Sequence, residues 1–367
     1  MTNTRPNHHR YLRRLFVAGA IVAVLVLVAL STIGIWKPIA KRSKWFIVAT
    51  NVYQDLLRQT HLRADQIGQG EGSRRTAADV PRDLDAIDKT FDGYLRYSGL
   101  SGATLGSKRV LELGPGYNIG VALRFAAAGA PFVSTIDKFV PLEDDAYHQM
   151  LYRSLRARLA PNEQRRFDEA IDLETHVALR PERLQYVYGR GFEEADTYAP
   201  ASFDLIVSNA VLEEIYDIDT AFAAMDRLLR PGGSLLHKID LRDYGMFTKN
   251  GFPALEFLTV PDAVYQRMVQ SSGQPNRRLV DYYRAKTTAL GYDTTIYTTW
   301  VLGNPKELVP HKTNIEKGVD YSDDTTALIQ AIRPRLLPRY QQLSDADLMV
   351  QGIYLVARKA PGGPHGS

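Results

Sequence analysis

The pattern of apolar and polar positions predicts alternating strands and helices from about residue 83 onward. Several of the strand-like runs are apolar throughout instead of alternating, which is typical of strands covered by helices on both faces. The predicted strands are 109–113, 132–137, 184–189, 203–209, 234–241, 294–302 and 351–360, and the predicted helices are 83–100, 119–128, 142–159, 220–229 and 278–290. This alternation predicts a doubly wound α/β sheet.

The same pattern divides the chain into parts. An apolar, basic segment comes first, a polar and Gly-containing stretch follows, and the α/β pattern then continues almost to the C-terminus. Two long segments interrupt it, and such insertions are commonly lids or binding loops. We expect a membrane anchor over 1–44, a juxtamembrane segment and linker over 45–82, an α/β domain over 83–360 with insertions at 243–278 and 303–349, and a disordered tail over 361–367.

An uncharged run of 22 residues, Leu15 to Trp36, lies in the first part. Its length exceeds the roughly 20 apolar residues that cross a bilayer as a helix, and Trp36 and Trp45 suit an interfacial position. A cleaved signal peptide and a buried soluble helix are the alternatives, but the run is long for the first and lacks a polar face for the second. The sequence therefore predicts one transmembrane helix over 15–36, and the balanced basic flanks do not orient it.

Charge is distributed unevenly along the chain. Lys and Arg number 45 and Asp and Glu 41, a net charge of +4. Eight basic and no acidic residues lie in the first 44 positions, so the other 323 carry 37 basic and 41 acidic residues, a net charge of −4. A body of this sign is a poor match for the phosphates that dominate nucleic-acid affinity, so no nucleic-acid partner is expected. The absence of cysteine excludes disulfides, thiolate nucleophiles and thiolate metal ligands.

A glycine-rich turn follows the first predicted strand. In VLELGPGYNIG, Glu112 stands near the strand end, Gly114 and Gly116 lie in the turn, and the second strand ends in another acid, Asp137. Such a turn lets backbone N–H groups approach a ligand closely. Glu112 would repel a pyrophosphate but attract an ammonium or sulfonium group, and an acid at the position of Asp137 accepts hydrogen bonds from ribose hydroxyls. Together the two carboxylates fit S-adenosylmethionine, a cationic amino acid joined to adenosine.

Four motifs in order resemble those of the class I S-adenosylmethionine-dependent methyltransferases: VLELGPGYNIG, STID, FDLIVSNAVLEEI and LLRPGGSLLHKIDLRDY. The resemblance extends from about Asp83 to Ala360 and implies a seven-stranded Rossmann-like sheet of order 3-2-1-4-5-7-6 with strand seven antiparallel. It also implies that the enzyme transfers a methyl group from S-adenosylmethionine. The cofactor-binding residues that it implies are Glu112, Gly114, Pro115, Gly116, Asn118, Asp137, Phe192 and Asn209.

No strong catalytic constellation is visible, as suits a reaction in which the cofactor brings the reactive group and the protein supplies orientation. Asp240 and Asp243, near the end of the fifth strand, are the catalytic candidates. His237 is expected to be a core residue and His311 a solvated surface residue. No metal is expected. The acceptor atom is expected to be O or N on a small molecule, a sugar or a lipid-linked substrate.

Two other functions are open to the same sequence. An aminopropyl transferase shares this fold, although VSNAV at the end of strand four lacks the paired acids that such enzymes require. A non-catalytic, membrane-tethered scaffold would not need the intact cofactor motifs. Because S-adenosylmethionine is made in the cytosol, we expect a single-pass membrane protein with its catalytic domain facing the cytoplasm.

Overall fold

The computed structural model describes residues 42–61, 75–139, 145–194, 197–271 and 273–362. The predicted transmembrane helix over 15–36 lies outside these residues, as do much of the linker and the last five residues of the tail. Among the helices that are described, none combines the length and the apolar character needed to cross a bilayer.

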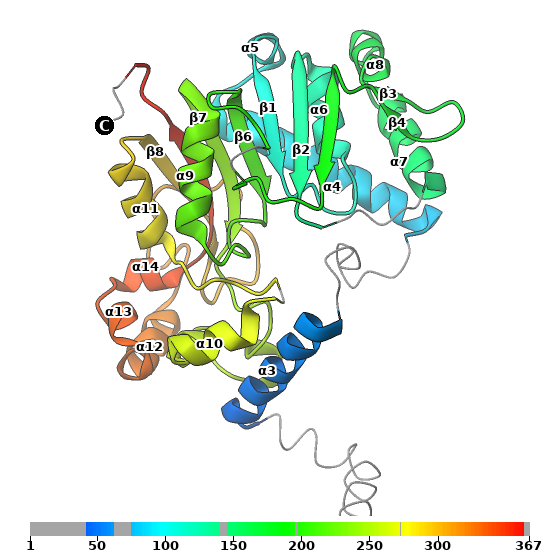
Figure 1. Cartoon of the computed structure of the whole chain (residues 1–367). Coiled ribbons are helices and arrows are strands. Elements are labelled where there is room, and N and C mark those ends of the chain that lie inside the picture. The colour runs from blue at the N-terminus through cyan, green and yellow to red at the C-terminus, as the bar shows by residue number, and fades with distance from the viewer. Residues whose placement is uncertain (1–41, 62–74, 140–144, 195–196, 272, 363–367) are drawn as a thin grey trace, which may run out of the picture.

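The fold is built on a seven-stranded sheet with the strand order β5-β2-β1-β6-β7-β9-β8 (Figure 1). In chain order this is 3-2-1-4-5-7-6, and β9 is antiparallel to both of its neighbours while the other pairs are parallel. The predicted strand order, with the seventh strand antiparallel, is therefore confirmed. The strands are β1 (Arg109–Leu113), β2 (Phe132–Asp137), β5 (Leu184–Tyr188), β6 (Phe203–Asn209), β7 (Leu229–Asp240), β8 (Asp293–Val301) and β9 (Val350–Arg358).

Helices cover both faces of the sheet because the strands carry apolar side chains in both directions. On one face Val110, Val133 and Leu205 pack against α4 (Val80–Ser98), α6 (Gly120–Ala128), α7 (Asp145–Ala157) and α8 (Pro161–Asp168). On the other face Leu111 and Ile206 pack against α9 (Ile218–Leu228) and α11 (Val280–Ala289). Each strand therefore contributes to two cores.

The two insertions fold into short helices at the edge of the sheet toward which the parallel strands run (Figure 1). The first contains α10 (Asp262–Val269), and the second contains α12 (Asp323–Ile332), α13 (Pro338–Gln341) and α14 (Asp345–Met349). Remote from this edge, α5 (Gly102–Leu105) precedes β1, and β3 (Ile171–Asp172) and β4 (Ala178–Leu179) form a small hairpin. The remaining described elements are the short 3-10 turns Ala77–Asp79, Thr248–Asn250, Glu256–Thr259 and Arg333–Arg335.

The juxtamembrane segment begins with the helix α3 (Lys44–His61), which packs against α10. Its Ile47 and Val48 belong to the core, and Asp55 is buried. The Asp55 carboxylate accepts a hydrogen bond from the Ser271 backbone N–H at 2.8 Å. This part of the juxtamembrane segment is thus docked on the body of the protein.

Candidate cofactor and acceptor sites

The glycine turn adopts a backbone conformation that few other residues tolerate. Gly114 and Gly116 have φ of 59° and 75°, in the left-handed region. A Cβ on Gly114 would lie 2.6 Å from Cγ2 of Val211, whereas a Cβ on Gly116 would point into open space. The turn therefore packs closely on one side and leaves room beside Gly116 on the other.

The side chain of Glu112 is buried beneath this turn, and its Oε2 atom has no hydrogen-bond partner among the described residues. Burial raises its pKa to about 8, although a hydrogen bond from the Ala122 backbone opposes the rise and the charge of Asp137 adds to it. An unpaired buried carboxyl oxygen is costly unless a ligand satisfies it. A cationic ligand would supply the missing partner and favour the ionised form.

Five of the predicted cofactor residues meet around one cavity of about 100 Å³ behind the turn. Its wall is completed by Ala86, Ile87 and Thr90 of α4 and by Val121, and the predicted residues in it are Glu112, Gly114, Pro115, Asn118 and Asn209. Asn118 also fixes the start of α6, because its Oδ1 accepts a hydrogen bond from the Gly120 N–H at 2.9 Å.

The other predicted cofactor residues lie outside the lining of this cavity. Asp137, at the end of β2, is buried, and its Oδ1 accepts a hydrogen bond from the Phe139 N–H at 2.9 Å. Its charge adds to the rise in the pKa of Glu112 that burial causes. Phe192 is buried in the core beyond β5. Its contact with the cofactor stays a prediction.

The two catalytic candidates are both engaged by neighbouring residues. Asp240 forms an ion pair with Arg242, with 2.6 Å between Oδ2 and Nη2. The buried Asp243 carboxylate accepts hydrogen bonds from the backbone N–H groups of Gly245, Phe247 and Thr248 and from the Thr248 hydroxyl. Neither aspartate is part of the lining of the two cavities described in this section. Their catalytic role stays a prediction.

A second group of carboxyls, Glu213 and Glu214, follows β6, and the sequence left Glu213 open between contact with the substrate and stabilisation of a helix N-terminus. Glu213 Oε1 accepts hydrogen bonds from the Asp240 N–H at 2.9 Å and the Tyr244 hydroxyl at 3.1 Å, while its Oε2 has no partner among the described residues. Burial raises the pKa of Glu213 to about 8 and that of Glu214 to about 7, the latter also under the charge of Asp137. The backbone of Tyr244, whose hydroxyl donates to Glu213, is in the left-handed region with φ of 52°. At neutral pH the Glu213 carboxyl is therefore mostly protonated, and a cationic ligand nearby would favour its ionised form.

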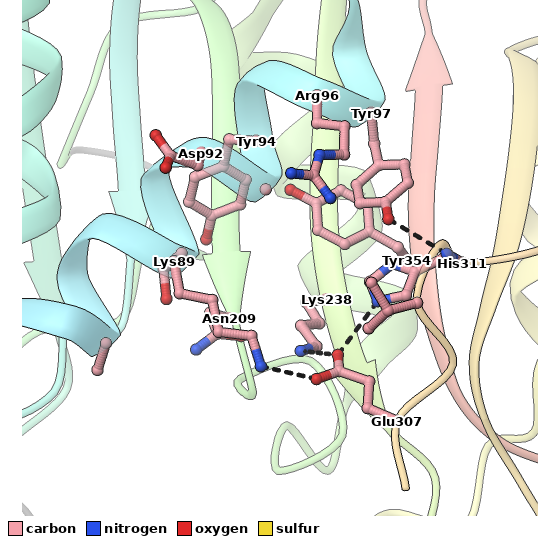
Figure 2. A pocket seen from close by; sticks show the side chains of 14 residues that line it. Lys89, Asp92, Tyr94, Arg96, Tyr97, Asn209, Lys238, Glu307, His311 and Tyr354 are labelled. Atoms are coloured by element: carbon pink, nitrogen blue, oxygen red, sulfur yellow. Dashed lines mark hydrogen bonds and ion pairs between the residues drawn. The ribbon is translucent and has the colours of Figure 1, made fainter. Parts of the chain in front are cut away.

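A larger cavity of about 430 Å³ shares Ala86, Thr90 and Asn209 with the lining of the glycine-turn cavity. Figure 2 shows the side chains that line this larger cavity. It lies between α4, the ends of β6 and β7, strand β9 and the beginning of the second insertion. The side chains that give it chemical character are those of Lys89, Asp92, Tyr94, Arg96, Tyr97, Lys238, Glu307, His311 and Tyr354.

Glu307 is the centre of an ion network in this cavity (Figure 2). Its carboxylate forms ion pairs with Lys89 at 2.8 Å and with Lys238, and His311 Nε2 lies within hydrogen-bond distance of Glu307 Oε1, at 3.1 Å. The two lysines lower the pKa of Glu307 to about 2, against the opposing effect of burial, so the carboxylate is ionised at neutral pH. The network connects α4 and β7 to the second insertion.

His311 is held rigidly at one side of the cavity. Its ring stacks on that of Tyr97, with 4.7 Å between centroids and 9° between planes, and the Tyr97 hydroxyl lies 3.3 Å from the His311 backbone N–H. Burial lowers the pKa of His311, so the imidazole is neutral at pH 7. The prediction that His311 is a solvated surface residue is therefore wrong, since only 9% of its side chain is exposed.

Three buried polar atoms of the cavity lining have no partner among the described residues: the Tyr94 and Tyr354 hydroxyls and His311 Nδ1. Hydroxyls can donate and accept, whereas a neutral imidazole nitrogen without hydrogen only accepts. Unpaired buried polar atoms that gather in one cavity favour a polar occupant. His237, by contrast, is buried within the sheet, where its Nδ1 lies 2.7 Å from the Ser208 hydroxyl, in agreement with its predicted place in the core.

The chain matches the family model described as "Methyltransferase domain" over residues 85–288, more than half of its length. No curated protein sequence matches it. The chain belongs to the methyltransferase family. It is therefore a methyltransferase, and the expectation of S-adenosylmethionine as its cofactor rests on its own residues around the glycine turn.

Solved structures that match the chain share little sequence with it. Phosphoethanolamine N-methyltransferase 2 of Haemonchus contortus, solved with phosphomonomethylethanolamine and S-adenosylhomocysteine, is 14% identical, with a TM-score of 0.38 over 84% of this chain and 61% of that one. An S-adenosylmethionine-dependent methyltransferase of Mesorhizobium loti is 16% identical, with a TM-score of 0.36 over 74% and 100%. The YcgJ protein of Bacillus subtilis is 13% identical, with a TM-score of 0.39 over 75% and 100%.

The residues around the glycine turn fit the cofactor. Glu112, with its unpaired buried oxygen, would hold the amino group, and the open side of Gly116 would admit the methionine part. Asp137 would accept hydrogen bonds from the ribose hydroxyls. When bound, the cofactor supplies a methyl group on a positively charged sulfur, which the surrounding carboxyls would favour.

Proposed function

We propose that the chain transfers the methyl group to an oxygen or nitrogen atom of a polar acceptor bound in the larger cavity. The observation that carries this proposal is that the two cavities share three lining residues, Ala86, Thr90 and Asn209. The smaller cavity lies beside the residues suited to the methionine part of the cofactor, which carries the reactive methyl group. An acceptor in the larger cavity would therefore approach the cofactor from the methionine end.

The size and lining of the larger cavity support a small, hydroxylated acceptor. Its volume of about 430 Å³ is within the usual range of small-molecule sites, roughly 300–1,000 Å³. The Tyr94 and Tyr354 hydroxyls have no partner within the part of the chain that the structure describes, and Glu307 holds Lys89 and Lys238 in place. A sugar, free or lipid-linked, offers the alternating donors and acceptors that would satisfy such a lining.

The chain's own contribution to the reaction is orientation, exclusion of water and acceptance of a proton. Glu307 is a poor base because the lysines keep it ionised and stabilised. The neutral imidazole of His311 is better suited to accept a proton from a hydroxyl acceptor. Asp240 and Asp243 are the alternative proton acceptors, although Arg242 pairs with Asp240 and the Phe247 backbone N–H donates a hydrogen bond to Asp243.

The full-length protein can be tested with methyl-labelled S-adenosylmethionine and separate membrane and soluble extracts. We expect label to enter one acceptor class, and none with the Gly116→Val variant. Once the acceptor is purified, Tyr354→Phe and His311→Asn should each raise its KM or lower kcat at least about tenfold, the scale of one lost hydrogen bond to a buried group, while cofactor affinity stays unchanged. If Asp240→Asn abolishes transfer and both cavity variants behave as wild type, the larger cavity is not the acceptor site.

We also propose that the protein is a single-pass membrane protein whose catalytic domain faces the cytoplasm. The uncharged run from Leu15 to Trp36 supports the anchor, and the cytosolic supply of S-adenosylmethionine supports the orientation. An anchor would raise the effective concentration of a membrane-bound acceptor. Protease added to intact spheroplasts should spare the catalytic domain and should digest it after lysis. Digestion without lysis would contradict the proposed orientation.

A further inference from the structure

The helix α3 presents two different faces. One face is fastened to the body through Ile47, Val48 and Asp55, as described above, and Lys44 pairs with the buried Glu256 at 3.3 Å. Since Asp55 is the only acidic residue of the helix and points into the protein, no carboxylate of α3 is exposed. The helix is therefore fixed in position relative to the sheet.

The outward face of α3 carries an apolar stripe, consisting of Trp45, Ala49, Tyr53 and Leu56. Trp45 is 57% exposed, Tyr53 61% and Leu56 54%, and Ala49 is exposed between them. At about 100° per residue these four positions fall within an arc of about 80° on the helix surface. Three of the nine large apolar side chains that are exposed on the described part of the chain thus gather on this one helix face.

The composition and position of the stripe favour a lipid surface as its partner. Trp and Tyr prefer the membrane interface, where an apolar ring can be buried while its polar edge stays hydrated. The exposed Arg42 adds positive charge at the start of the helix, which attracts anionic lipids. Only seven residues separate Lys44 from Trp36, the end of the uncharged run. The stripe therefore begins close to the point where the proposed anchor would leave a bilayer.

We propose that α3 lies flat in the interface of the membrane, with the stripe of Trp45, Ala49, Tyr53 and Leu56 facing the lipid. This proposal rests on the proposed membrane placement of the N-terminal segment and adds an orientation for the whole domain. Because α3 and α10 lie at the edge toward which the parallel strands run, the cofactor end of the sheet faces the bilayer (Figure 1). A lipid-linked acceptor would then meet the protein at the edge where the two cavities open.

The proposal can be tested with full-length protein in phosphatidylcholine–phosphatidylglycerol vesicles that contain bromine-labelled lipids. The chain has three tryptophans, Trp36, Trp45 and Trp300. Replacing Trp36 and Trp300 by phenylalanine leaves Trp45 as the reporter. A second reporter is Leu56→Trp in a chain whose three tryptophans are phenylalanine. The control retains Trp300 alone, which lies in β8 beneath Arg242, 4.5 Å from the ring centroid.

A flat helix places both α3 reporters at the same depth, although position 56 is about 16 Å further along the helix axis than position 45. We expect lipids brominated near the headgroup to quench both reporters at least about twofold and aqueous iodide to quench them weakly. Trp300, half-buried beneath Arg242, should be quenched less by the brominated lipids than either α3 reporter. Tyr53→Glu should reduce the lipid quenching of both.

Two other results would overturn the proposal. Quenching of Trp45 but not of the reporter at position 56 would mean that α3 stands away from the membrane and is near it only at the start. Protection of both from bromolipid and iodide would mean that a protein surface, such as a second copy of the chain, covers the stripe. Neither result depends on methyl transfer, so a failure of this proposal is distinct from a failure of the proposed acceptor site.

Discussion

Replacing Glu112 by glutamine should stabilise the cofactor-free protein at alkaline pH while it weakens cofactor binding. The pKa of Glu112 rises from 4.5 to about 8 in the folded protein, mainly because the side chain is buried. Between these values the folded state binds more protons than the unfolded state, so the free energy of unfolding falls as the pH rises. A pKa shift of this size corresponds to a loss of about 5 kcal/mol in the free energy of unfolding once the buried carboxyl is ionised. Glutamine carries no charge, so the variant does not lose this stability.

The assay is chemical unfolding of full-length wild type and Glu112→Gln in the same detergent, from about pH 5 to pH 9, without cofactor. The variant should gain stability relative to wild type across this range, by an amount of about 3–5 kcal/mol. Glu182→Gln is the matched control, since it removes the same charge at an exposed position. Cofactor affinity should fall in Glu112→Gln by about 1–3 kcal/mol, the scale of a charge-assisted hydrogen bond. A stability difference that does not change with pH would refute the reasoning.

Three further predictions concern the same site. Asp137→Ala should weaken binding of S-adenosylmethionine by about 1–3 kcal/mol in calorimetry, and unchanged affinity would remove Asp137 from the ribose role. Gly116→Val should keep native circular dichroism but lose cofactor binding, because its side chain would enter the open side of the turn; normal binding would show that the cofactor lies elsewhere. Methyl transfer should survive treatment with a chelator, and a loss of activity that magnesium restores would contradict this.

The sequence predicted the sheet well because its strands are nearly continuous apolar runs with clear boundaries. The predicted spans of β1, β2 and β6 coincide with the observed ones. Glu112 and the glycine turn could be predicted because strand, acid and turn are adjacent in the chain. The short hairpin β3–β4 and the helices of the insertions were missed, since two-residue strands and helices of four to ten residues carry little periodicity.

The larger cavity could not be predicted because it gathers residues from distant segments. Lys89, Lys238 and Glu307 come from a helix, a strand and a loop, and only the fold brings them within ion-pair distance. His311 has no sequence signal for its environment, since its burial depends on Tyr97, which is 214 residues away. Asp243 illustrates the opposite difficulty: its place after β7 suggested catalysis, yet the local chain turns back and donates hydrogen bonds to it.

The arrangement of cofactor and acceptor cavities is tested most directly by an experimental structure of the full-length protein with S-adenosylhomocysteine. We predict that the amino group of the ligand contacts Glu112, that the ribose hydroxyls donate to Asp137, and that the sulfur atom faces Asn209, where the two cavities meet. A ligand bound through these residues, but with its sulfur turned away from the cavity of Lys238 and Glu307, would contradict the proposed acceptor site. A ligand that contacts neither Glu112 nor Asp137 would contradict the account of the cofactor site itself.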